Sequence, residues 1–335
     1  MAFEQSIALN SVLLAMGTAL LYGGGSFLVQ GAARIALRFN ISSMVVGLTV
    51  VAFGTSAPEL FVSLLSAVQG KMGISIGNVV GSNVINIALV LGIAAVLRPT
   101  PVDRTTVLID GPVMMFSYVI FMVVAADVGG ANFWTGGIIE RWEGGLMVAA
   151  LGIYVFFLYE RSRASRAVIP LAEEVPVDET GGRPFAIDLL LVLLGTGFLA
   201  GGAELLVQGA GWLAMNLMGA SERFVGIAIV ALGTSLPELV TTLVSLGRGE
   251  MEISVGNLIG SNIFNTLFVL GVTSMVLPIT VGTTDFSVDF FFMVATTLIL
   301  VGDLAVRRAV SRSMGVVLLT AYASYVVYLA ATRAM

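Results

Sequence analysis

The 335-residue sequence contains neither cysteine nor histidine, and only 11% of its residues are charged. Without cysteine there is no disulfide, thiolate metal site or thiol nucleophile. Without histidine there is no imidazole ligand and no side chain that ordinarily titrates near neutral pH. Haem sites, most zinc sites and triad hydrolases are therefore disfavoured. The formal net charge of −5 gives no indication of nucleic-acid binding.

The shortage of charge also bears on the fold class. A soluble domain carries about 25% charged residues, which it needs for its surface. This chain is 57% hydrophobic and has a mean hydropathy of +1.00. We therefore expect an all-α integral membrane protein. The first residues, "MAFEQ", lack the basic segment of a cleaved signal peptide, so we expect the mature protein to begin there.

The apolar runs define the expected spans. A transmembrane helix needs about 20 mostly apolar residues. The first and sixth runs are unusually long, which suggests tilted helices. Ten segments meet the length requirement, at about 7–38, 43–69, 73–97, 105–126, 137–159, 186–218, 222–247, 252–277, 286–303 and 313–332.

The basic residues predict the orientation. With the N-terminus outside, twelve of the sixteen Lys and Arg residues fall on the inner side and four on the outer side. The positive-inside rule then places both termini outside a plasma or inner membrane. The polar connection at 160–185 becomes a cytoplasmic linker between a first half, 1–159, and a second half, 186–335.

The two halves repeat each other. "GTSAPEL" at 54–60 returns as "GTSLPEL" at 233–239, and "GNVVGSNVIN" at 77–86 returns as "GNLIGSNIFN" at 256–265, both at an offset of 179 residues. Each half has five expected spans, an odd number, so the second half must insert upside down. We therefore predict ten transmembrane helices in two inverted five-helix repeats, an architecture of secondary transporters with sites near the membrane midplane.

The repeated motifs place two acids, Glu59 and Glu238, near the expected twofold axis. Pro58 and Pro237 precede them and are expected to break their helices and turn backbone carbonyls toward a cavity. An unpaired acid at mid-membrane costs about 2.5–3.5 kcal/mol. Since no Lys or Arg lies within a core span to neutralise them, protons or mobile cations must do so.

Neutral oxygens accompany the acids. Threonine and serine hydroxyls flank each glutamate, and the second motif repeats a polar residue every four positions, on one helical face. Hard cations such as Ca²⁺ take about 6–8 oxygen ligands. Asn78 and Asn257 begin this polar face in the two halves. The candidate ligands besides the glutamates are Ala52, Thr55, Ser56, Ser82 and Asn86, and in the second half Ala231, Thr234, Ser235, Ser261 and Asn265.

Five other polar residues lie near the expected spans. Asp110 and Asp289 recur at the same offset and are expected either to cap helices or to mark an internal break. Asn83 and Asn262 are expected to pack between helices. Glu204 breaks the symmetry, since its counterpart is a serine, and it fits either a bond to a neighbouring helix or a separate proton site.

With these motifs the chain resembles the Ca²⁺/cation antiporter superfamily, in particular the prokaryotic Na⁺/Ca²⁺ exchangers. The resemblance implies exchange of Na⁺ for Ca²⁺, usually three for one, with the first and sixth helices sliding to alternate access. It implies central ligands shared by both ions at Glu59 and Glu238, and backbone oxygen for Ca²⁺ at Thr55 and Thr234. The implied remaining positions are Na⁺ ligands at Ala52, Ala231, Ser56 and Ser235, with Ser82, Ser261, Asn86 and Asn265 lining the rest.

Alternatives remain open at this point. The same fold could exchange Ca²⁺ or another cation for H⁺, although "GNVV" and "GNLI" lack the acid usual in that branch. K⁺ co-transport is disfavoured because Asn265 stands where K⁺-dependent members carry Asp. A cation channel could use the same oxygens, and an intramembrane enzyme is the weakest alternative. We expect no cofactor and no protein partner, only Ca²⁺, Na⁺, possible H⁺ and the lipid bilayer.

Overall fold

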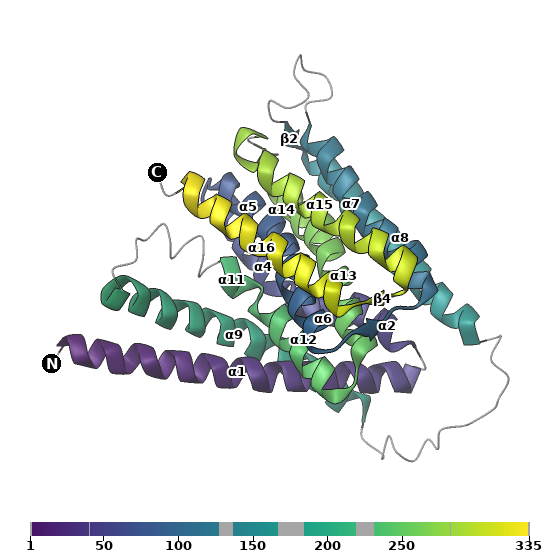
Figure 1. Ribbon diagram of the computed structural model, residues 1–335, viewed down its shortest axis with the longest axis horizontal. Coiled ribbons are helices and arrows are strands. Elements are labelled where there is room, and N and C mark those ends of the chain that lie inside the picture. The colour runs from purple at the N-terminus through teal and green to yellow at the C-terminus, as the bar shows by residue number, and fades with distance from the viewer. Residues whose placement is uncertain are drawn as a thin grey trace.

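The computed structural model describes residues 2–39, 41–126, 137–166, 184–218, 231–281 and 283–333. Almost all of these residues are helical (Figure 1). Within these ranges eight helices are long and apolar enough to cross a membrane, and a bent pair of helices makes a possible ninth. The expected seventh span falls partly on 219–230, outside the described residues. The chain is a multi-pass helical membrane protein.

The first half holds five successive helical segments, several of them interrupted by a π-helical turn, labelled η. Their bounds are α1 Ala2–Phe39, α2 Ser43–Val46, η1 Gly47–Val51, α3 Ala52–Thr55, α4 Ala57–Val68, α5 Met72–Val84, η2 Ile85–Val90, α6 Leu91–Leu97, β1 Thr100–Pro101, η3 Thr106–Asp110, α7 Gly111–Ala125, β2 Ile138–Ile139 and α8 Arg141–Arg166.

The second half follows the same order as far as it is described. Its elements are α9 Phe185–Met218, α11 Ala231–Thr234, α12 Leu236–Arg248, α13 Met251–Phe264, η6 Asn265–Val269, α14 Leu270–Val276, β3 Ile279–Thr280, α15 Thr283–Arg307, β4 Ala309–Val310 and α16 Arg312–Arg333.

The expected helix breaks are present at both proline motifs. Ser56 leaves the helical region, with φ −82° and ψ 2°, and the helices on either side of it are bent by 42°. Ser235 has nearly the same conformation, with φ −90° and ψ 3°. Pro58 and Pro237 cause the breaks, because each lacks the N–H that would bond the carbonyl four residues earlier.

The two long helices, α1 and α9, pack against each other over most of their length (Figure 1). Glycines allow this close approach: a methyl group on Gly24 would lie 2.8 Å from the carbonyl oxygen of Gly195, and one on Gly17 would lie 2.8 Å from that of Gly202. Small residues at such crossings bring helix backbones together in a membrane. The pair forms a unit at one edge of the molecule.

The remaining helices repeat their contacts between the two halves. β1 pairs antiparallel with β4, and β2 pairs antiparallel with β3. Likewise α6 packs on α16, and α14 packs on α8. Each of these pairs joins one half to the other. The described part of the chain therefore has two matching sets of cross-half contacts.

Two acids that were expected to cap helices do something else. Asp110 makes no capping hydrogen bond; its carboxylate accepts from Tyr154 at 2.9 Å and pairs with both guanidinium nitrogens of Arg161 at 3.1 and 3.2 Å. Asp289 lies inside α15 and accepts from Tyr325 at 2.6 Å. Capping was wrong for both acids, because partners on α8 and α16 take these carboxylates. The other expectation, an internal break, fits Asp110, which lies where the π-helical turn η3 meets α7.

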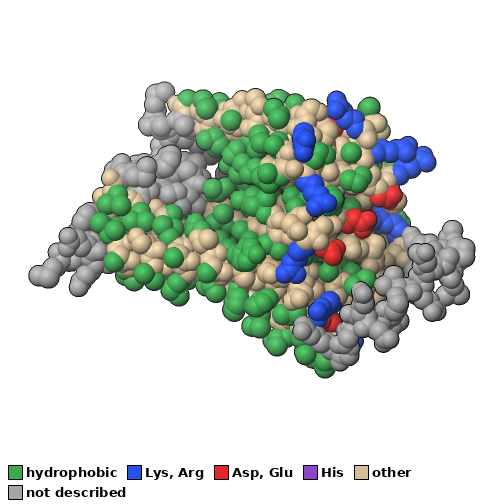
Figure 2. Space-filling model, turned by 60° about the horizontal axis from the view of Figure 1, so that its bottom comes forward, with side chains coloured by type: hydrophobic (Ala, Val, Ile, Leu, Met, Phe, Trp, Pro, Cys, Tyr) green, Lys and Arg blue, Asp and Glu red, His purple; other side chains and the backbone are tan. Residues whose placement is uncertain are grey.

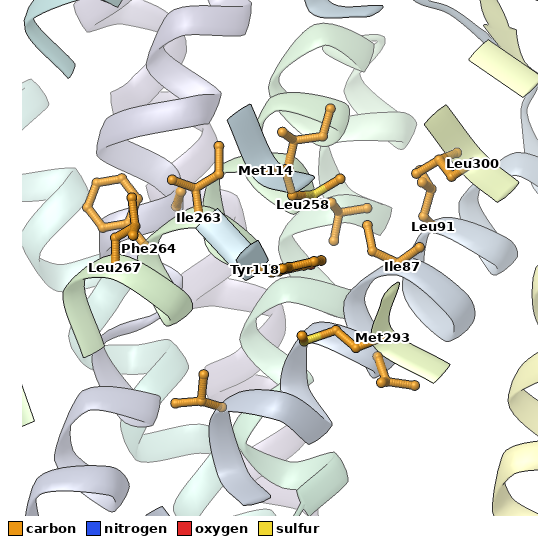
Figure 3. Packing of buried hydrophobic residues seen from close by; sticks show 14 of the residues in the cluster. Ile87, Leu91, Met114, Tyr118, Leu258, Ile263, Phe264, Leu267, Met293 and Leu300 are labelled. Atoms are coloured by element: carbon orange, nitrogen blue, oxygen red, sulfur yellow. The ribbon is translucent and has the colours of Figure 1, made fainter. Parts of the chain in front are cut away.

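The apolar core lies where α5, α7, α13 and α15 meet. Figure 3 shows Met114 and Tyr118 of α7 among Leu258, Ile87 and Met293 from neighbouring segments. All five side chains are buried. This packing holds α5 and α13 in fixed positions, and these two helices carry the second repeated motif.

The surface is apolar and its basic residues are unevenly placed. Figure 2 shows hydrophobic side chains over much of the visible face and Lys and Arg side chains gathered toward one end. Two of the basic residues bond to the ends of other helices: Arg98 donates to the carbonyl of Leu246, and Arg312 donates to that of Val96. Both belong to the group that the sequence places on the inner side. An exposed apolar belt with charges at the end suits a lipid environment.

Candidate cation-binding site

The two glutamates of the repeated motifs meet inside the helical bundle. Glu59 lies in the first turn of α4 and Glu238 in the first turn of α12, each just after the proline that breaks its helix. Both side chains are completely buried. Ser82, which bonds the carboxylate of Glu59, lies 3.4 Å from the hydroxyl of Thr234 at the helix break before Glu238. Among the described residues, neither takes part in a salt bridge.

Hydrogen bonds cross from the first half to the second at Thr55. Its hydroxyl donates to Oδ1 of Asn257 at 3.0 Å and lies 3.1 Å from the hydroxyl of Ser261. Asn257 and Ser261 are on α13, so the break before α4 faces a helix of the other half. Thr55 therefore contacts the polar motif of the second half, on α13, rather than that of the first half, on α5.

The same arrangement occurs in the opposite direction. The hydroxyl of Thr234 donates to Oδ1 of Asn78 at 3.3 Å and lies 3.4 Å from the hydroxyl of Ser82. Thr234 is Thr55 displaced by 179 residues, and Asn78 and Ser82 correspond to Asn257 and Ser261 in the same way. The site is thus built jointly by both halves.

Glu59 has neighbours within its own half. Ser82 donates to Oε1 of Glu59 at 3.3 Å. The amide of Asn78 donates to the backbone carbonyl of Glu59 at 3.1 Å and to the hydroxyl of Ser63 at 2.9 Å. These bonds fix α5 against α4 beside the carboxylate.

Many polar atoms at the site have no hydrogen-bond partner, although they are buried. Nearly all buried polar groups in proteins are satisfied, and an unsatisfied one costs about 1–3 kcal/mol. So many at one place point to a missing ligand. The unpartnered atoms are Oε2 of Glu59, both carboxylate oxygens of Glu238, the hydroxyls of Ser56 and Ser235, and both polar side-chain atoms of Asn86 and Asn265.

The backbone contributes in different ways at the two breaks. The carbonyl of Ala52 accepts from the N–H of Ser56 at 3.0 Å and from the hydroxyl of Thr55 at 3.3 Å. At the second break the N–H of Ser235 bonds instead to the carbonyl of Leu232 at 3.2 Å.

The two asparagines at the end of the second motif lie where the helix changes form. Asn86 is in the π-helical turn η2, and Asn265 begins the π-helical turn η6. Such turns interrupt the regular hydrogen-bond ladder and are frequent at functional sites. Both side chains are fully buried.

The side chains expected to pack between helices do so. Asn83 donates to the hydroxyl of Thr266 at 3.0 Å, and Asn262 accepts from the hydroxyl of Tyr118 at 3.0 Å. Gly256 and Gly260 of α13 approach the backbones of Met44 and Leu48 closely enough that an added methyl group would lie 2.7 Å from their carbonyl oxygens.

The candidate ligand set underrates three residues. Asn78 and Asn257 are the hydrogen-bond partners of Thr234 and Thr55, so they belong to the site as much as the serines four residues further on. Their four-residue spacing is the signal for them. Ser63, the partner of Asn78, lies four residues after Glu59, on the same helical face.

The donor set is suited to a hard cation. It offers two carboxylates and many hydroxyl, amide and carbonyl oxygens, and no thiolate or imidazole. Within the described residues no group of three or more Asp, Glu, His or Cys could hold a metal. Any cation here would therefore be bound mainly by neutral oxygens around two charges.

The chain is similar in sequence to a known protein family and to known relatives. Its residues 9–160 and 187–331 match the family described as sodium/calcium exchanger protein. It is 33% identical to the putative antiporter CaxA of Alkalimonas amylolytica, over 94% of this chain and 97% of that protein. It is 32% identical to the sodium/calcium exchanger MaX1 of Methanosarcina acetivorans, over 96% of this chain and 99% of the relative.

A solved structure is similar as well. The sodium-calcium exchanger NCX_Mj, soaked with Na⁺ and Sr²⁺, matches with a TM-score of 0.78 and 29% identity, over 97% of this chain and 99% of that one. The family match covers most of the chain, and the structural match extends over nearly all of it. The chain therefore belongs to the sodium/calcium exchanger family.

Proposed function

We propose that this protein exchanges Na⁺ for Ca²⁺ across the membrane, with Glu59 and Glu238 as the central ligands. One observation carries the proposal: the two glutamates are fully buried, stand at helix breaks joined by the Ser82–Thr234 contact, and have no basic partner among the described residues. Two negative charges inside a membrane protein need compensation of about two positive charges. One Ca²⁺ or a set of Na⁺ ions can provide it, and alternation between them is exchange.

The other ligands follow from the unpartnered atoms. The hydroxyls of Ser56 and Ser235 and the amides of Asn86 and Asn265 are buried and lack hydrogen bonds. We assign them, with Ser82 and Ser261, to the remaining cation positions. Backbone oxygens of Ala52, Thr55, Ala231 and Thr234 complete the proposed set.

We further propose a membrane arrangement of ten spans in two inverted repeats, with both termini outside. The matching cross-half contacts, β1 with β4 and β2 with β3, support the repeat. The gathering of basic side chains at one end supports that end as the inner one (Figure 2). Alternating access would come from sliding of the α1–α9 pair across the other helices. A ratio of three Na⁺ to one Ca²⁺ would make the exchange electrogenic.

The test is uptake of ⁴⁵Ca²⁺ into liposomes that are loaded with Na⁺ and diluted into Na⁺-free buffer. Uptake should require the Na⁺ gradient and fall to background in Glu59→Gln and Glu238→Gln. Valinomycin with a set K⁺ gradient should change the rate if the exchange is electrogenic. Uptake driven by a pH gradient and indifferent to Na⁺ would instead assign H⁺ as the counter-ion and reject the proposal.

A further inference from the structure

The α1–α9 pair covers the two halves of the molecule unequally. α1 packs along α12, whereas α9 barely touches α4. A methyl group on Gly25 of α1 would lie 3.1 Å from Cγ1 of Val240 and 3.5 Å from Cγ2 of Val244. The counterparts of those valines on α4, Phe61 and Leu65, are 72% and 59% exposed. The flank of α12 is closed, and the flank of α4 is open.

A row of buried hydroxyls leads from the site along the closed flank. Thr241 and Ser245 follow Glu238 by three and seven residues on α12, so they lie on the same side of the helix. Both side chains are completely buried, and neither hydroxyl has a hydrogen-bond partner. The row ends at Arg248, the last residue of α12.

Arg248 closes this row by reaching the opposite helix. Its guanidinium donates to the hydroxyl of Ser26 on α1. This hydrogen bond keeps the positive charge of Arg248 at the junction of α1 and α12. Arg98 lies at the same end, where it donates to the carbonyl of Leu246.

The open flank carries the opposite charge pattern. The counterpart of Arg248 on α4 is Gln69, which is neutral, and the counterpart of Ser26 on α9 is Glu204, which is acidic. Glu204 is exposed, and its Oε1 accepts from Gln208 at 2.6 Å. Val207, less than one turn further along α9, packs on Gly233 at the helix break beside Glu238.

Exposure of Glu204 inside a spanning helix has a physical consequence. A carboxylate in hydrocarbon costs about 2.5–3.5 kcal/mol even by lenient measures, so an exposed one must be reached by water. α9 is among the helices long and apolar enough to span a membrane, and Glu204 lies near its middle. Water therefore has to reach the face of α9 that carries Glu204, near the middle of the span.

We propose that the two entrances to the site are electrostatically unequal, with Glu204 drawing cations into the α9–α4 entrance and Arg248 barring them from the α1–α12 entrance. This inference rests on the proposed exchange function. A fixed charge at an entrance changes the local concentration of cations and their rate of arrival. The repeat supplies a neutral residue for comparison at each position. Ser26 corresponds to Glu204, and Gln69 corresponds to Arg248.

The test measures half-saturating Na⁺ and Ca²⁺ concentrations separately at the two faces of the membrane, in liposomes of one protein orientation. Arg248→Gln should lower both values at one face, and Glu204→Ser should raise both at the other. The energy of an ion in an electrostatic potential is proportional to its charge. The half-saturating concentration of Ca²⁺ should therefore change by the square of the factor for Na⁺, about fourfold against about twofold. Arg248→Lys, which keeps the charge, should restore the wild-type values. Gln69→Arg should mimic Glu204→Ser.

Two results would overturn the inference. The first is that Arg248→Gln and Glu204→Ser change the half-saturating concentrations at the same face of the membrane. The second is that the half-saturating concentrations of Na⁺ and Ca²⁺ change by equal factors, as a structural defect would cause. Since the chain has no cysteine, Glu204→Cys and Arg248→Cys also permit labelling with a membrane-impermeant thiol reagent. The two should react from opposite faces, and reaction of both from one face would reject two separate entrances. Absence of Na⁺-dependent uptake in the wild type would reject the proposed function, while the labelling would still decide the question of access.

Discussion

The two halves of the site share their residues but not their hydrogen bonds. In the first half Asn78 donates to the Glu59 carbonyl and to Ser63, and Ser82 donates to the Glu59 carboxylate. In the second half the amide nitrogen of Asn257 and both carboxylate oxygens of Glu238 have no partner. Three bonds hold the first half around Glu59, whereas the second half has one longer bond between its motif residues, from Ser261 to Asn257 at 3.5 Å.

The difference in hydrogen bonding between the halves extends along α4 and α12, the helices that carry the two glutamates. Thr242, the counterpart of Ser63, is fully buried, and its hydroxyl has no partner. Sequence symmetry therefore does not impose symmetry of contacts. A repeat in which one half is rigid and the other has unsatisfied groups can bind a cation by rearranging only the second half, which reduces the free energy needed to reorganise the site.

The largest effect that can sharpen this comparison is removal of either central charge. Glu59→Gln and Glu238→Gln should each weaken Ca²⁺ binding about a hundredfold or more, because loss of a buried charge ligand costs roughly 3 kcal/mol. Thermal unfolding in detergent over a Ca²⁺ titration measures this. Without ions, Glu238→Gln should raise the unfolding temperature more than Glu59→Gln, since Glu59 already has Ser82 as a donor.

Equal changes in the ion-free unfolding temperature would contradict the inequality of the halves. Ser82→Ala is the matched control for this prediction, because it removes the donor from Glu59 and leaves both charges. In that background the two glutamine variants should behave alike.

A second prediction concerns the two asparagines. Asn78→Ala should lower the free energy of unfolding by about 2 kcal/mol, because it removes the two bonds that its amide donates, to the Glu59 carbonyl and to the Ser63 hydroxyl. Asn257→Ala should cost about 1 kcal/mol, since only its carbonyl oxygen is bonded. Denaturant unfolding of the ion-free protein provides the measurement. A larger loss for Asn257→Ala would reverse the assignment of the rigid half.

Part of this site could be predicted from the sequence. The recurrence of the glutamates after Pro58 and Pro237 located the acids and the helix breaks, because proline acts on its own backbone. The four-residue spacing identified one polar face on each motif helix. These are local properties of a helix, so residue order alone determines them.

The remaining features depend on which helices meet. That Thr55 contacts Asn257 rather than the first-half Asn78 follows from the packing of η1 and α3 against α13. Asp110 was expected to cap a helix because of its position near a helix start, but Arg161 of α8 pairs with it. Contacts across such distances are set by tertiary packing, which spacing does not reveal.

A third prediction separates the two cross-half hydroxyls. Thr55 has the shorter contacts, 3.0 Å to Asn257 and 3.1 Å to Ser261, against 3.3 and 3.4 Å for Thr234. Thr55→Val should raise the half-saturating Ca²⁺ concentration by about fivefold and Thr234→Val by about twofold, within the range of one net hydrogen bond. Thr55→Ser, which keeps the hydroxyl, is the control. Flux measurements in liposomes decide it, and a larger effect at Thr234 would count against the comparison.

The smallest difference is expected where the halves are alike. Gly70 and Gly249 end α4 and α12 with φ of +74° and +80°, and neither has a neighbour within 4 Å of a built Cβ atom. Gly70→Ala and Gly249→Ala should therefore each cost about 1 kcal/mol from the left-handed backbone alone, with transport unchanged. The two losses in denaturant unfolding should agree within about 0.5 kcal/mol. If they differ by more, the two halves are unequal in general stability, and the contrast between Asn78 and Asn257 can no longer be assigned to the site.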